Sequence, residues 1–415
     1  MSTIQVQGLR PLKGEIEIQG SKNAVLPMMA ASILHKGTTV LTHVPRIQDV
    51  FCMMGILEYM GCSCSLRDHE LTIDASELTG TSIPETYVKT MRSSIMILGA
   101  LLGRAGEAVT HYPGGCSIGK RPIDLHLFAL RELGADIRED HEMITAKAAD
   151  LRGTDIHLTY PSVGATENAV LAAVLADGET RVFGAAREPE IEEMCLFLNQ
   201  MGARISGIGS DVLVVDGVEE LHDTIYRVVG DRIVAGTYLA GTAAVGGHVR
   251  LTGLNASHLL SVLPVFQMMG MSIQVEEQAV TMKSSSRPLP VTIETGPYPG
   301  FPTDLQSPFM AVMAVGRGES LILENVFEGR YETARQLQRL GAQIIIEEKA
   351  AHIIGVNPLH GGTVEAKDLR GGAALVVAGI AAEGETVITD CHHIFRGYED
   401  ICRDLSALGA RIIAQ

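Results

Sequence analysis

The chain has 415 residues, of which 46% are hydrophobic and 20% are charged, a composition typical of a soluble globular protein and not of a disordered one. This length is too great for one ordinary hydrophobic core, so two domains of about 200 residues each are expected. The net charge of −16 disfavours binding to nucleic acid or to an anionic membrane, so we expect neither. An anionic substrate would need a local cluster of arginine and lysine.

The N-terminal residues alternate apolar and polar side chains as a strand does, without the basic start and apolar run of a signal peptide. The longest apolar stretches, residues 94–103 and 371–382, are shorter than the roughly 20 residues that cross a bilayer. The seven cysteines are an odd number with no repeated pair spacing, which is typical of reduced thiols. These features predict a cytoplasmic protein.

One pattern recurs along the whole chain: an amphipathic helix that ends at a glycine, followed by a short strand. Glycine is expected there because a left-handed residue after a helix costs little only without a Cβ atom. A single α/β unit of this size cannot bury its apolar faces alone, so three units in each of two domains are predicted. A solenoid is the competing layout, although solenoid repeats run from 20 to about 50 residues. The six glycines are Gly61, Gly134, Gly202, Gly270, Gly341 and Gly409, so their spacings are 73, 68, 68, 71 and 68 residues.

A second glycine turn lies upstream of each helix, and an arginine follows five of these turns at a distance of 9 to 15 residues. Any one of these arginines could be an ordinary solvated charge. If the units are related by pseudo-symmetry, however, their loops converge and bring several guanidinium groups together, as an anionic substrate requires. The five are Arg46, Arg121, Arg187, Arg330 and Arg396.

The first local motif, residues 20–24, places Lys22 and Asn23 between a strand-like segment and an apolar helix expected from Ala24. A lysine at a helix N-terminus opposes the helix dipole unless an anion binds there as well. An exposed capping turn is the alternative interpretation.

The second motif, residues 112–122, has three glycines and sets Cys116 beside Lys120 and Arg121. Neighbouring cations favour the reactive thiolate, and glycine hinges suit a loop that closes over a substrate. Most free cysteines are small buried hydrophobes, but few lie in a glycine-rich basic loop.

Three further motifs lie at expected ends of strands or starts of helices. Residues 161–168 begin a helix whose free N–H groups could hold a diphosphate. Asp304 lies in a loop between Pro302 and Pro308, where a carboxylate is otherwise simply solvated. Residues 368–370 precede a helix expected from Gly371, and residues 395–399 precede the last helix.

Together these motifs resemble the UDP-N-acetylglucosamine 1-carboxyvinyltransferases, a family of enolpyruvyl transferases, over residues 4–413. Among these motifs, the Pro-Gly-Gly-Cys sequence at residues 113–116 distinguishes this family best from others. The resemblance implies an α/β fold: a two-domain inside-out α/β barrel, each domain built of three βαβαββ-type units, with the active site in the interdomain cleft. It implies a first domain of residues 22–229, which carries the Cys116 loop, and a second domain of residues 1–21 and 230–415.

The resemblance also implies that the enolpyruvyl group of phosphoenolpyruvate passes to the 3-hydroxyl of UDP-N-acetylglucosamine, with loss of phosphate. This is the first committed step of peptidoglycan synthesis. Cys116 would protonate the methylene carbon or form a covalent adduct, and fosfomycin would alkylate it. Asp304 would take the hydroxyl proton, with Asn23 beside it. Neither a metal nor a cofactor is expected, and the chain would be a monomer or a weak homo-oligomer.

The remaining site residues implied by the resemblance bind substrate. Lys22, Arg121 and Arg396 would hold the phosphate and carboxylate of phosphoenolpyruvate, while Arg92 and Arg370 add positive charge. The cradle of the nucleotide would be Arg121, Pro122, Ile123, Asp124, Leu125, Ser162, Val163, Gly164 and Val326, and Arg330 and Asp368 would complete the cleft.

Three alternatives remain. The first is the transferase on the same scaffold that uses shikimate 3-phosphate, a family that lacks the Gly-Gly-Cys loop. The second is a paralogue that binds the nucleotide sugar without turning it over. The third is a metal site at Cys391, His392, His393 and Cys402, whose spacing matches no zinc pattern. The sequence departs from the family pattern at Val234, at residues 329–333 and at Gly371 and Gly372.

Overall fold

The computed structural model describes residues 3–113 and 122–415, so Cys116 and Arg121 lie outside the described residues. The described chain forms two compact units. The central unit comprises residues 20–113 and 122–229, and the terminal unit comprises residues 3–19 and 230–415. Both are mixed α/β structures.

The central unit is built around three helices, α1 (Lys22–Ala31), α4 (Ile97–Ala105) and α6 (Val163–Ala173). They pack against one another, and almost all of their side chains are buried. A helix that is apolar on all sides requires cover on all sides, which outer helices and sheets provide. The outer helices are α2 (Gln48–Tyr59), α3 (Glu85–Thr90), α5 (Asp124–Glu132) and α7 (Pro189–Gln200), with 3-10 turns η1 (Ser32–Leu34) and η2 (Arg92–Met96).

Three sheets surround these helices in the central unit. The first has the strand order β13-β3-β5-β4, the second β6-β8-β7 and the third β11-β12-β10-β9. The strands are β3 (Thr38–Thr42), β4 (Ser63–Arg67), β5 (Glu70–Asp74), β6 (Glu107–His111), β7 (Asp136–Asp140), β8 (Met143–Lys147), β9 (Asp155–His157), β10 (Glu179–Phe183), β11 (Arg204–Ser206), β12 (Val212–Asp216) and β13 (Thr224–Arg227).

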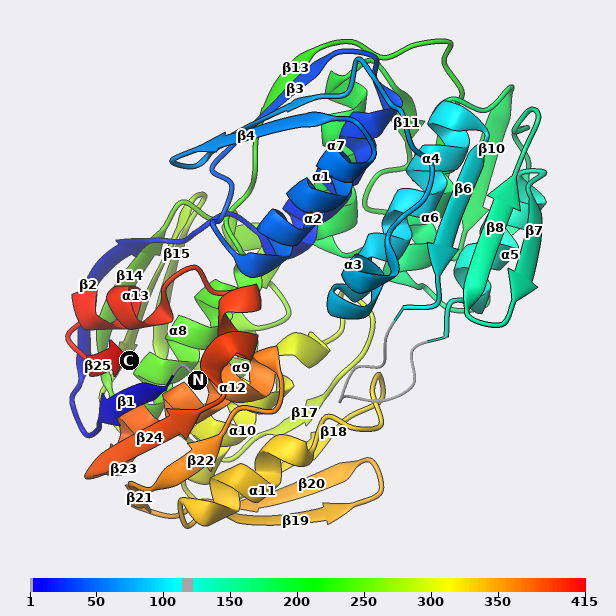
Figure 1. Cartoon of the computed structure of the whole chain (residues 1–415). Helices are drawn as coiled ribbons and strands as arrows, with labels where there is room; N and C mark the ends of the chain where they lie inside the picture. The colour runs from blue at the N-terminus through cyan, green and yellow to red at the C-terminus, as the bar shows by residue number, and fades with distance from the viewer. Residues whose placement is uncertain (1–2, 114–121) are drawn as a thin grey trace. The chain divides into compact units, whose positions relative to one another are not determined.

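The terminal unit repeats this plan with three buried helices, α8 (Arg232–Val245), α10 (Gln306–Ala314) and α12 (Leu369–Ala381), in contact with one another. Figure 1 shows these helices in the middle of the unit with the strands around them. Its other helices are α9 (Leu263–Met268), α11 (Glu332–Arg339) and α13 (Ile401–Ala407), with η3 (Ala256–Leu259), η4 (Thr303–Leu305) and η5 (Cys391–Arg396).

The sheets of the terminal unit have the orders β22-β24-β1-β25, β15-β16-β14-β2 and β17-β18-β20-β19, with a small pair β21-β23. The strands are β1 (Ile4–Gln7), β2 (Leu12–Glu17), β14 (Gly247–Thr252), β15 (Ser272–Glu276), β16 (Ala279–Ser284), β17 (Thr292–Glu294), β18 (Glu319–Leu323), β19 (Gln343–Glu347), β20 (Ala350–Ile354), β21 (Leu359–His360), β22 (Thr363–Glu365), β23 (Ala382–Glu383), β24 (Glu385–Thr389) and β25 (Arg411–Ala414).

The five four-stranded sheets share one topology, in which a parallel pair at one edge is followed by two antiparallel pairs. The sheet of β6 has three strands, but Ser82 bridges Val109 in parallel where the fourth strand would lie. Each unit is completed by a strand that is distant in sequence, since β13 pairs with β3 and β2 pairs with β14. The six sheets coincide with the six repeats of the sequence.

The six glycines that end the repeated helices adopt the backbone conformation that the sequence predicts. Their φ angles lie between +92° and +103°, in the region that L side chains rarely adopt. The helix starts differ slightly from expectation. The helix expected from Ala24 begins at Lys22, and the helix expected from Gly371 begins at Leu369, because Asp368 caps α12 two residues earlier. Val234 is buried in the first turn of α8.

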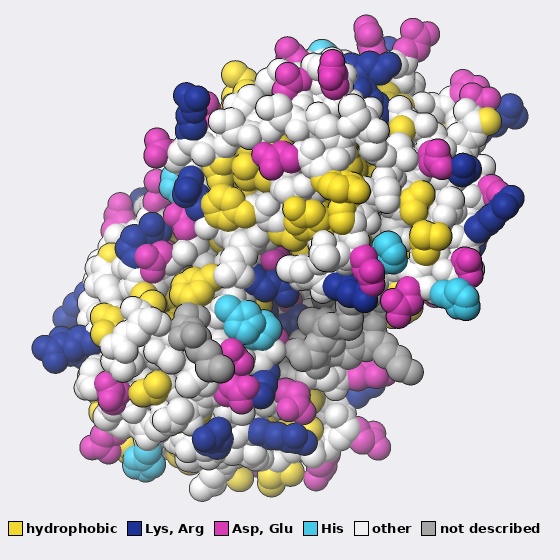
Figure 2. Space-filling model, viewed as in Figure 1, with side chains coloured by type: hydrophobic (Ala, Val, Ile, Leu, Met, Phe, Trp, Pro, Cys, Tyr) yellow, Lys and Arg dark blue, Asp and Glu magenta, His cyan; other side chains and the backbone are white. Residues whose placement is uncertain are grey.

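Charged side chains of both signs are interspersed over the faces shown in Figure 2, so the acidic total does not collect there into one acidic face. Across residues 3–113 and 122–415, no helix combines the length and the apolarity that a bilayer crossing demands.

The close approach of α4 and α6 predicts that Gly99→Ala is destabilising. A Cβ atom on Gly99 would lie 2.4 Å from the backbone oxygen of Asn168, so the helices would have to separate. We expect the free energy of unfolding, measured by urea denaturation, to fall by about 2 kcal/mol. In the control Gly80→Ala the nearest atom is 3.6 Å away, and a change within about 0.5 kcal/mol is expected. Equal effects of the two substitutions would contradict this account of the packing.

Candidate active site

Asp304 lies between two buried arginines in the terminal unit. Its Oδ1 accepts a hydrogen bond of 2.6 Å from Nη2 of Arg330, and its Oδ2 accepts bonds of 3.1 and 3.0 Å from Nε and Nη2 of Arg370. Both arginine side chains are 3% exposed, whereas the Asp304 side chain is 25% exposed. The carboxylate of Asp304 is therefore the most solvent-accessible group of the cluster, and the two guanidinium groups are buried behind it.

Three separate segments bring these groups together. Asp304 lies in η4 just before α10, Arg330 lies in the loop before α11, and Arg370 lies in the first turn of α12. Aromatic rings support the guanidinium groups, since Arg330 lies 5.0 Å from the ring centre of Phe327 and Arg370 lies 5.8 Å from that of Tyr398. Each charge is held in place by packing as well as by the ion pair.

The cluster keeps Arg370 cationic. Burial alone lowers the pKa of this guanidinium, but the negative charges of Asp304 and Asp231 and the Tyr398 phenol together outweigh it and raise the pKa. In the described part of the chain, Nε of Arg330 and Nη1 of Arg370 have no hydrogen-bond acceptor. The cluster thus has more donors than Asp304 can satisfy, which suits a site for an anion.

Asp304 is predicted to remove a proton from a hydroxyl, and here both of its oxygens accept hydrogen bonds from guanidinium groups. Charge-assisted hydrogen bonds of this kind are strong. Transfer of a proton to Asp304 would weaken these two ion pairs. The geometry shows the carboxylate as the partner of two cations.

Asp368 has a structural role at the same end of α12. Its Oδ1 accepts hydrogen bonds of 2.9 Å from the backbone N–H groups of Arg370 and Gly371, so it caps the helix. Asp368 is therefore placed to orient Arg370, which follows it by two residues.

Arg396, which is predicted to bind phosphoenolpyruvate, is the last residue of η5.

Glu324, which the sequence analysis missed, organises the loop that carries Val326. Its Oε1 accepts bonds of 2.8 and 3.0 Å from the N–H groups of Val326 and Phe327. Its Oε2 accepts a bond of 2.9 Å from the hydroxyl of Thr303. Glu324 is 2% exposed, so it joins this loop to the turn of Asp304 from inside the unit. In the sequence, Glu324 could have been recognised as an acidic residue that directly follows a mostly apolar strand.

In the central unit, Lys22 begins α1 and forms an ion pair with Asp49, at 3.0 Å between Nζ and Oδ2. Asp49 lies in the first turn of α2 and its side chain is 3% exposed, whereas that of Lys22 is 14% exposed. The buried carboxylate fixes the direction of the ammonium group. No motif in the sequence marks Asp49 as part of the site.

A buried histidine connects the other predicted residues of the central unit. His126 Nδ1 lies 2.8 Å from Nδ2 of Asn168, whose Oδ1 accepts from the N–H of Gly99 at 2.7 Å and whose Nδ2 donates to Ile95 O at 3.1 Å. Because Asn168 is a donor to Nδ1, the histidine carries its hydrogen on Nε2. Burial, together with the positive charge of Arg92, lowers the pKa of His126 to about 4, so the ring is neutral near pH 7.

His126 also lies directly beneath the start of α6, where Ser162 caps the helix by accepting from the N–H of Ala165 at 3.4 Å. A Cβ atom on Gly164 would lie 2.5 Å from Cε1 of His126, so only glycine fits. Asp124 acts on the pKa of the same ring. The structure thus brings together the predicted segments at Arg92, at 123–125 and at 162–164.

Two of the repeated arginines bond to turns close to them in the fold. Arg46 Nη1 donates to Asp68 O at 3.1 Å, and Arg187 Nε donates to Gly209 O at 3.1 Å. In both cases the acceptor lies in the hairpin turn of the arginine's own sheet. These two side chains are exposed and stabilise local turns. Arg121 and Cys116 lie outside the described residues.

For the described part of the chain, no three His, Cys, Asp or Glu side chains gather as metal ligands would. Around the Cys391 and His393 segment, the Cys391 thiol donates to Ile388 O, and His392 pairs with Asp390 and stacks on His393.

Comparison with known proteins gives the family. The model of a family described as EPSP synthase (3-phosphoshikimate 1-carboxyvinyltransferase) matches residues 6–405. The enolpyruvyl transferase NikO of Streptomyces tendae has a TM-score of 0.90 at 24% identity, covering 100% of this chain and 99% of that one. An EPSP synthase of Acinetobacter baumannii has a TM-score of 0.75 at 19% identity, with 100% of both chains covered. These structures show a shared enolpyruvyl transferase fold.

Sequence relatives narrow the assignment. A protein of Caldanaerobacter subterraneus subsp. tengcongensis, named UDP-N-acetylglucosamine 1-carboxyvinyltransferase 2, is 44% identical over 100% of this chain and 99% of its own length. A protein of that name from Carboxydothermus hydrogenoformans is 42% identical over 99% of both. The chain belongs to the EPSP synthase family, and within it to the UDP-N-acetylglucosamine 1-carboxyvinyltransferases.

Removal of the Asp304 carboxylate should destabilise the protein, because two buried cations lose their counter-charge. We expect Asp304→Ala to lower the free energy of unfolding by about 3 kcal/mol, because Arg330 and Arg370 lose their counter-charge. The exposed pair of Glu365 and Lys367 supplies a control, and Glu365→Ala should change stability by less than about 0.5 kcal/mol. Inorganic phosphate should restore stability to Asp304→Ala more than sodium chloride of equal ionic strength does. Equal losses in the two variants would be inconsistent with the cluster.

The lowered pKa of His126 predicts a specific pH dependence. Below pH 6.5 the unfolded state takes up a proton that the folded state takes up only near pH 4, so stability is lost as the pH falls through this window. The total loss from this group is about 3 kcal/mol. His126→Gln should therefore show a smaller decline between pH 6.5 and 4 than the unsubstituted protein, in urea unfolding at each pH. The exposed His141, substituted as His141→Asn, should leave the decline unchanged. Identical slopes for His126→Gln and the parent would argue against a neutral buried ring.

Proposed function

We propose that the chain transfers the enolpyruvyl group of phosphoenolpyruvate to the 3-hydroxyl of UDP-N-acetylglucosamine and releases phosphate. The observation that carries this proposal is the 41–44% identity, over 97–100% of the chain, to relatives named UDP-N-acetylglucosamine 1-carboxyvinyltransferase. The geometry also supports it, because the cluster of Asp304, Arg330 and Arg370 suits an anionic substrate.

Phosphoenolpyruvate carries up to three negative charges, so its binding requires fixed cations. Lys22, Arg121 and Arg396 hold its phosphate and carboxylate in this proposal, and Arg92 and Arg370 add positive charge. The ion pair with Asp49 holds the Lys22 ammonium group in one direction before substrate arrives. Charges that need no reorganisation during the reaction usually make the largest contribution to catalysis.

The reaction proceeds by addition and then elimination. In the addition, the 3-oxygen of the sugar bonds to the central carbon of phosphoenolpyruvate, Asp304 takes the hydroxyl proton, and Cys116 gives a proton to the methylene carbon. In the elimination, the bond from that central carbon to the phosphate oxygen breaks and the new methyl group loses a proton, which restores the double bond. Each acid or base group typically contributes about 10²- to 10⁴-fold in rate.

The ion pairs of Asp304 give the addition step an order. Both carboxylate oxygens accept hydrogen bonds from guanidinium groups, and Asp304 becomes more open to the hydroxyl proton when one of these groups turns to another anion. The phosphate or carboxylate of phosphoenolpyruvate supplies that anion. The action of Asp304 as a base is thereby linked to the presence of phosphoenolpyruvate.

The nucleotide is held by the central unit in this proposal. Its diphosphate binds at the N-terminus of α6, at Ser162, Val163 and Gly164, with the neutral His126 beneath. Asn23 faces the sugar hydroxyl, and Asp368 and Arg330 complete the site. The remaining contacts to the nucleotide come from Arg121, Pro122, Ile123, Asp124, Leu125 and Val326.

For the architecture we propose the two-domain inside-out barrel of the family, with residues 22–229 as one domain and residues 1–21 with 230–415 as the other. The substrates bind between them, and the loop of Cys116 closes over phosphoenolpyruvate. The reaction is the first committed step of peptidoglycan synthesis and takes place in the cytoplasm, in a monomer or a weak homo-oligomer. The scattered cysteines support the reducing compartment.

The test is release of phosphate from phosphoenolpyruvate by the purified chain. We expect release with UDP-N-acetylglucosamine and none with shikimate 3-phosphate. Cys116→Ala should lower kcat by about 10²-fold or more, because it removes the general acid. Cys64→Ala is the matched control, since burial raises the pKa of that thiol to about 12 and keeps it unreactive, and its kcat should stay within about twofold.

Release with shikimate 3-phosphate alone would instead support the other acceptor, which the description of the matching family names. Binding of UDP-N-acetylglucosamine without any turnover would support the non-catalytic paralogue. Fosfomycin should add its mass to the peptide that contains Cys116, and an unmodified peptide after full inhibition would remove this thiol from the mechanism.

A further inference from the structure

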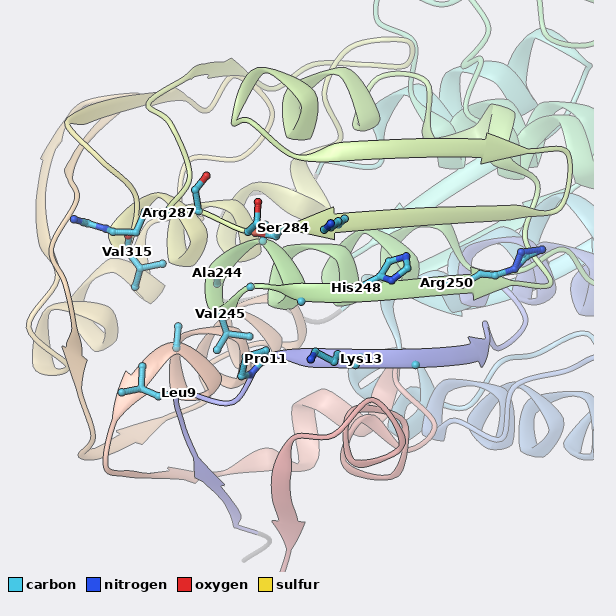
Figure 3. Close-up of a pocket in the computed structure, with 18 of the residues that line it drawn as sticks. Leu9, Pro11, Lys13, Ala244, Val245, His248, Arg250, Ser284, Arg287 and Val315 are labelled. Atoms are coloured by element: carbon cyan, nitrogen blue, oxygen red, sulfur yellow. The ribbon is translucent and has the colours of Figure 1, made fainter.

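A second candidate binding site lies in the terminal unit, at the opposite end of the central helices from Asp304 and Arg370. It is a groove of about 1090 Å³ lined by Val245 at the end of α8, Ala381 at the end of α12, and the strands β2, β14 and β16 (Figure 3). Arg370 lies in the first turn of α12, so a helix length of about 20 Å separates it from the groove. None of the residues predicted to bind or convert substrate lines it.

Three basic side chains cross the floor of this groove in one row. In the register of the sheet, His248 of β14 lies opposite Lys13 of β2 on one side and opposite Lys283 of β16 on the other. Neighbouring strands are about 4.8 Å apart, so the row spans only about 10 Å. Figure 3 shows Lys13 and His248 on adjacent strands at the groove.

This row carries a local excess of positive charge. Lys13 and Lys283 lie on the two strands that flank β14, and within residues 3–113 and 122–415 neither forms an ion pair. The chain has 49 acidic residues, so counter-charges are not scarce. Arg250, two residues further along β14, receives them: it lies 3.4 Å from Glu15 and 2.8 Å from Glu276. The sheet therefore neutralises Arg250 and leaves the two lysines beside it unpaired.

The other part of the groove is aliphatic. Leu9, Pro11, Val245 and Val315 line it, together with alanines at the helix ends. Leu9 has a φ of +59°, a left-handed conformation that costs energy for any residue with a Cβ and is rare for leucine, and it is 51% exposed. An exposed apolar side chain held in a strained conformation is a feature of ligand contacts. No Phe, Tyr or Trp of the described chain lines the groove, so its apolar part is aliphatic.

We propose that this groove binds a small organic diphosphate whose ester group is an aliphatic chain. The diphosphate lies across Lys13, His248 and Lys283, where two adjacent anionic groups neutralise both lysines. The hydroxyl groups of Ser285 and Ser286 supply further donors at the edge of the row. The aliphatic chain lies along Leu9, Pro11 and Val245, where apolar surface is otherwise exposed to water.

Geranyl diphosphate is a suitable probe, and isothermal titration calorimetry on the full chain measures its binding. We expect binding that is weakened about tenfold or more in Lys13→Gln with Lys283→Gln, and at least about threefold in Leu9→Asn. Asparagine tolerates positive φ, so Leu9→Asn removes apolar contact without adding backbone strain. The matched control, Lys36→Gln with Lys349→Gln, changes two exposed lysines elsewhere and should bind within about twofold of the parent.

Two further ligands distinguish this groove from the proposed active site. Inorganic diphosphate should bind about tenfold more weakly than geranyl diphosphate, because it lacks the aliphatic part. UDP-N-acetylglucosamine should not compete, whether or not the chain turns it over. The double lysine variant should also be about as stable as the parent, because both lysines are exposed and form no ion pair in the described chain. Undiminished binding in that variant, competition by the nucleotide sugar, or no heat of binding at about 1 mM probe would overturn the proposal.

Discussion

The sharing of one carboxylate by two buried guanidinium groups is the constraint on which the terminal unit's part of the site depends. Arg330 and Arg370 are almost completely removed from water, and a buried cation is tolerable only beside a counter-charge. Because Asp304 supplies that charge for both, the turn before α10, the loop before α11 and the start of α12 are held at fixed positions relative to one another. The need to neutralise two buried arginines therefore sets the local geometry.

The central helices explain why functional side chains gather where they do. A helix surrounded by sheets and other helices must be largely apolar, as α10 and α12 are beyond their first turns, and the buried Tyr238 in the middle of α8 bonds to Asp404. The helix starts hold further polar groups, because their free N–H groups need caps such as Asp231, Asp368 and Ser162. Caps, cations and donors thus occur together at the N-terminal ends.

How much the sequence could predict follows from the range of each interaction. The six positive-φ glycines were predictable because a helix terminus is a local feature, and so was the number of repeated units. The partners of the site residues were not, because they are distant along the chain. Asp49 is 27 residues from Lys22, and Asn168 is 42 residues from His126. The local contacts of Arg46 and Arg187 were not predictable either, since both bond to hairpin turns that the repeat spacing does not reveal.

The two ends of the central helices in the terminal unit differ in how they treat positive charge. At the N-terminal end each buried arginine has a fixed counter-ion, because burial makes an unpaired charge too costly. At the C-terminal end Lys13 and Lys283 are exposed, so water can solvate them and no counter-ion is obligatory. The net charge of −16 also lowers the cost of this local excess of cations, although salt screens the effect beyond about 8 Å. An exposed row of cations can therefore remain open for a mobile anion, whereas a buried pair must carry its own.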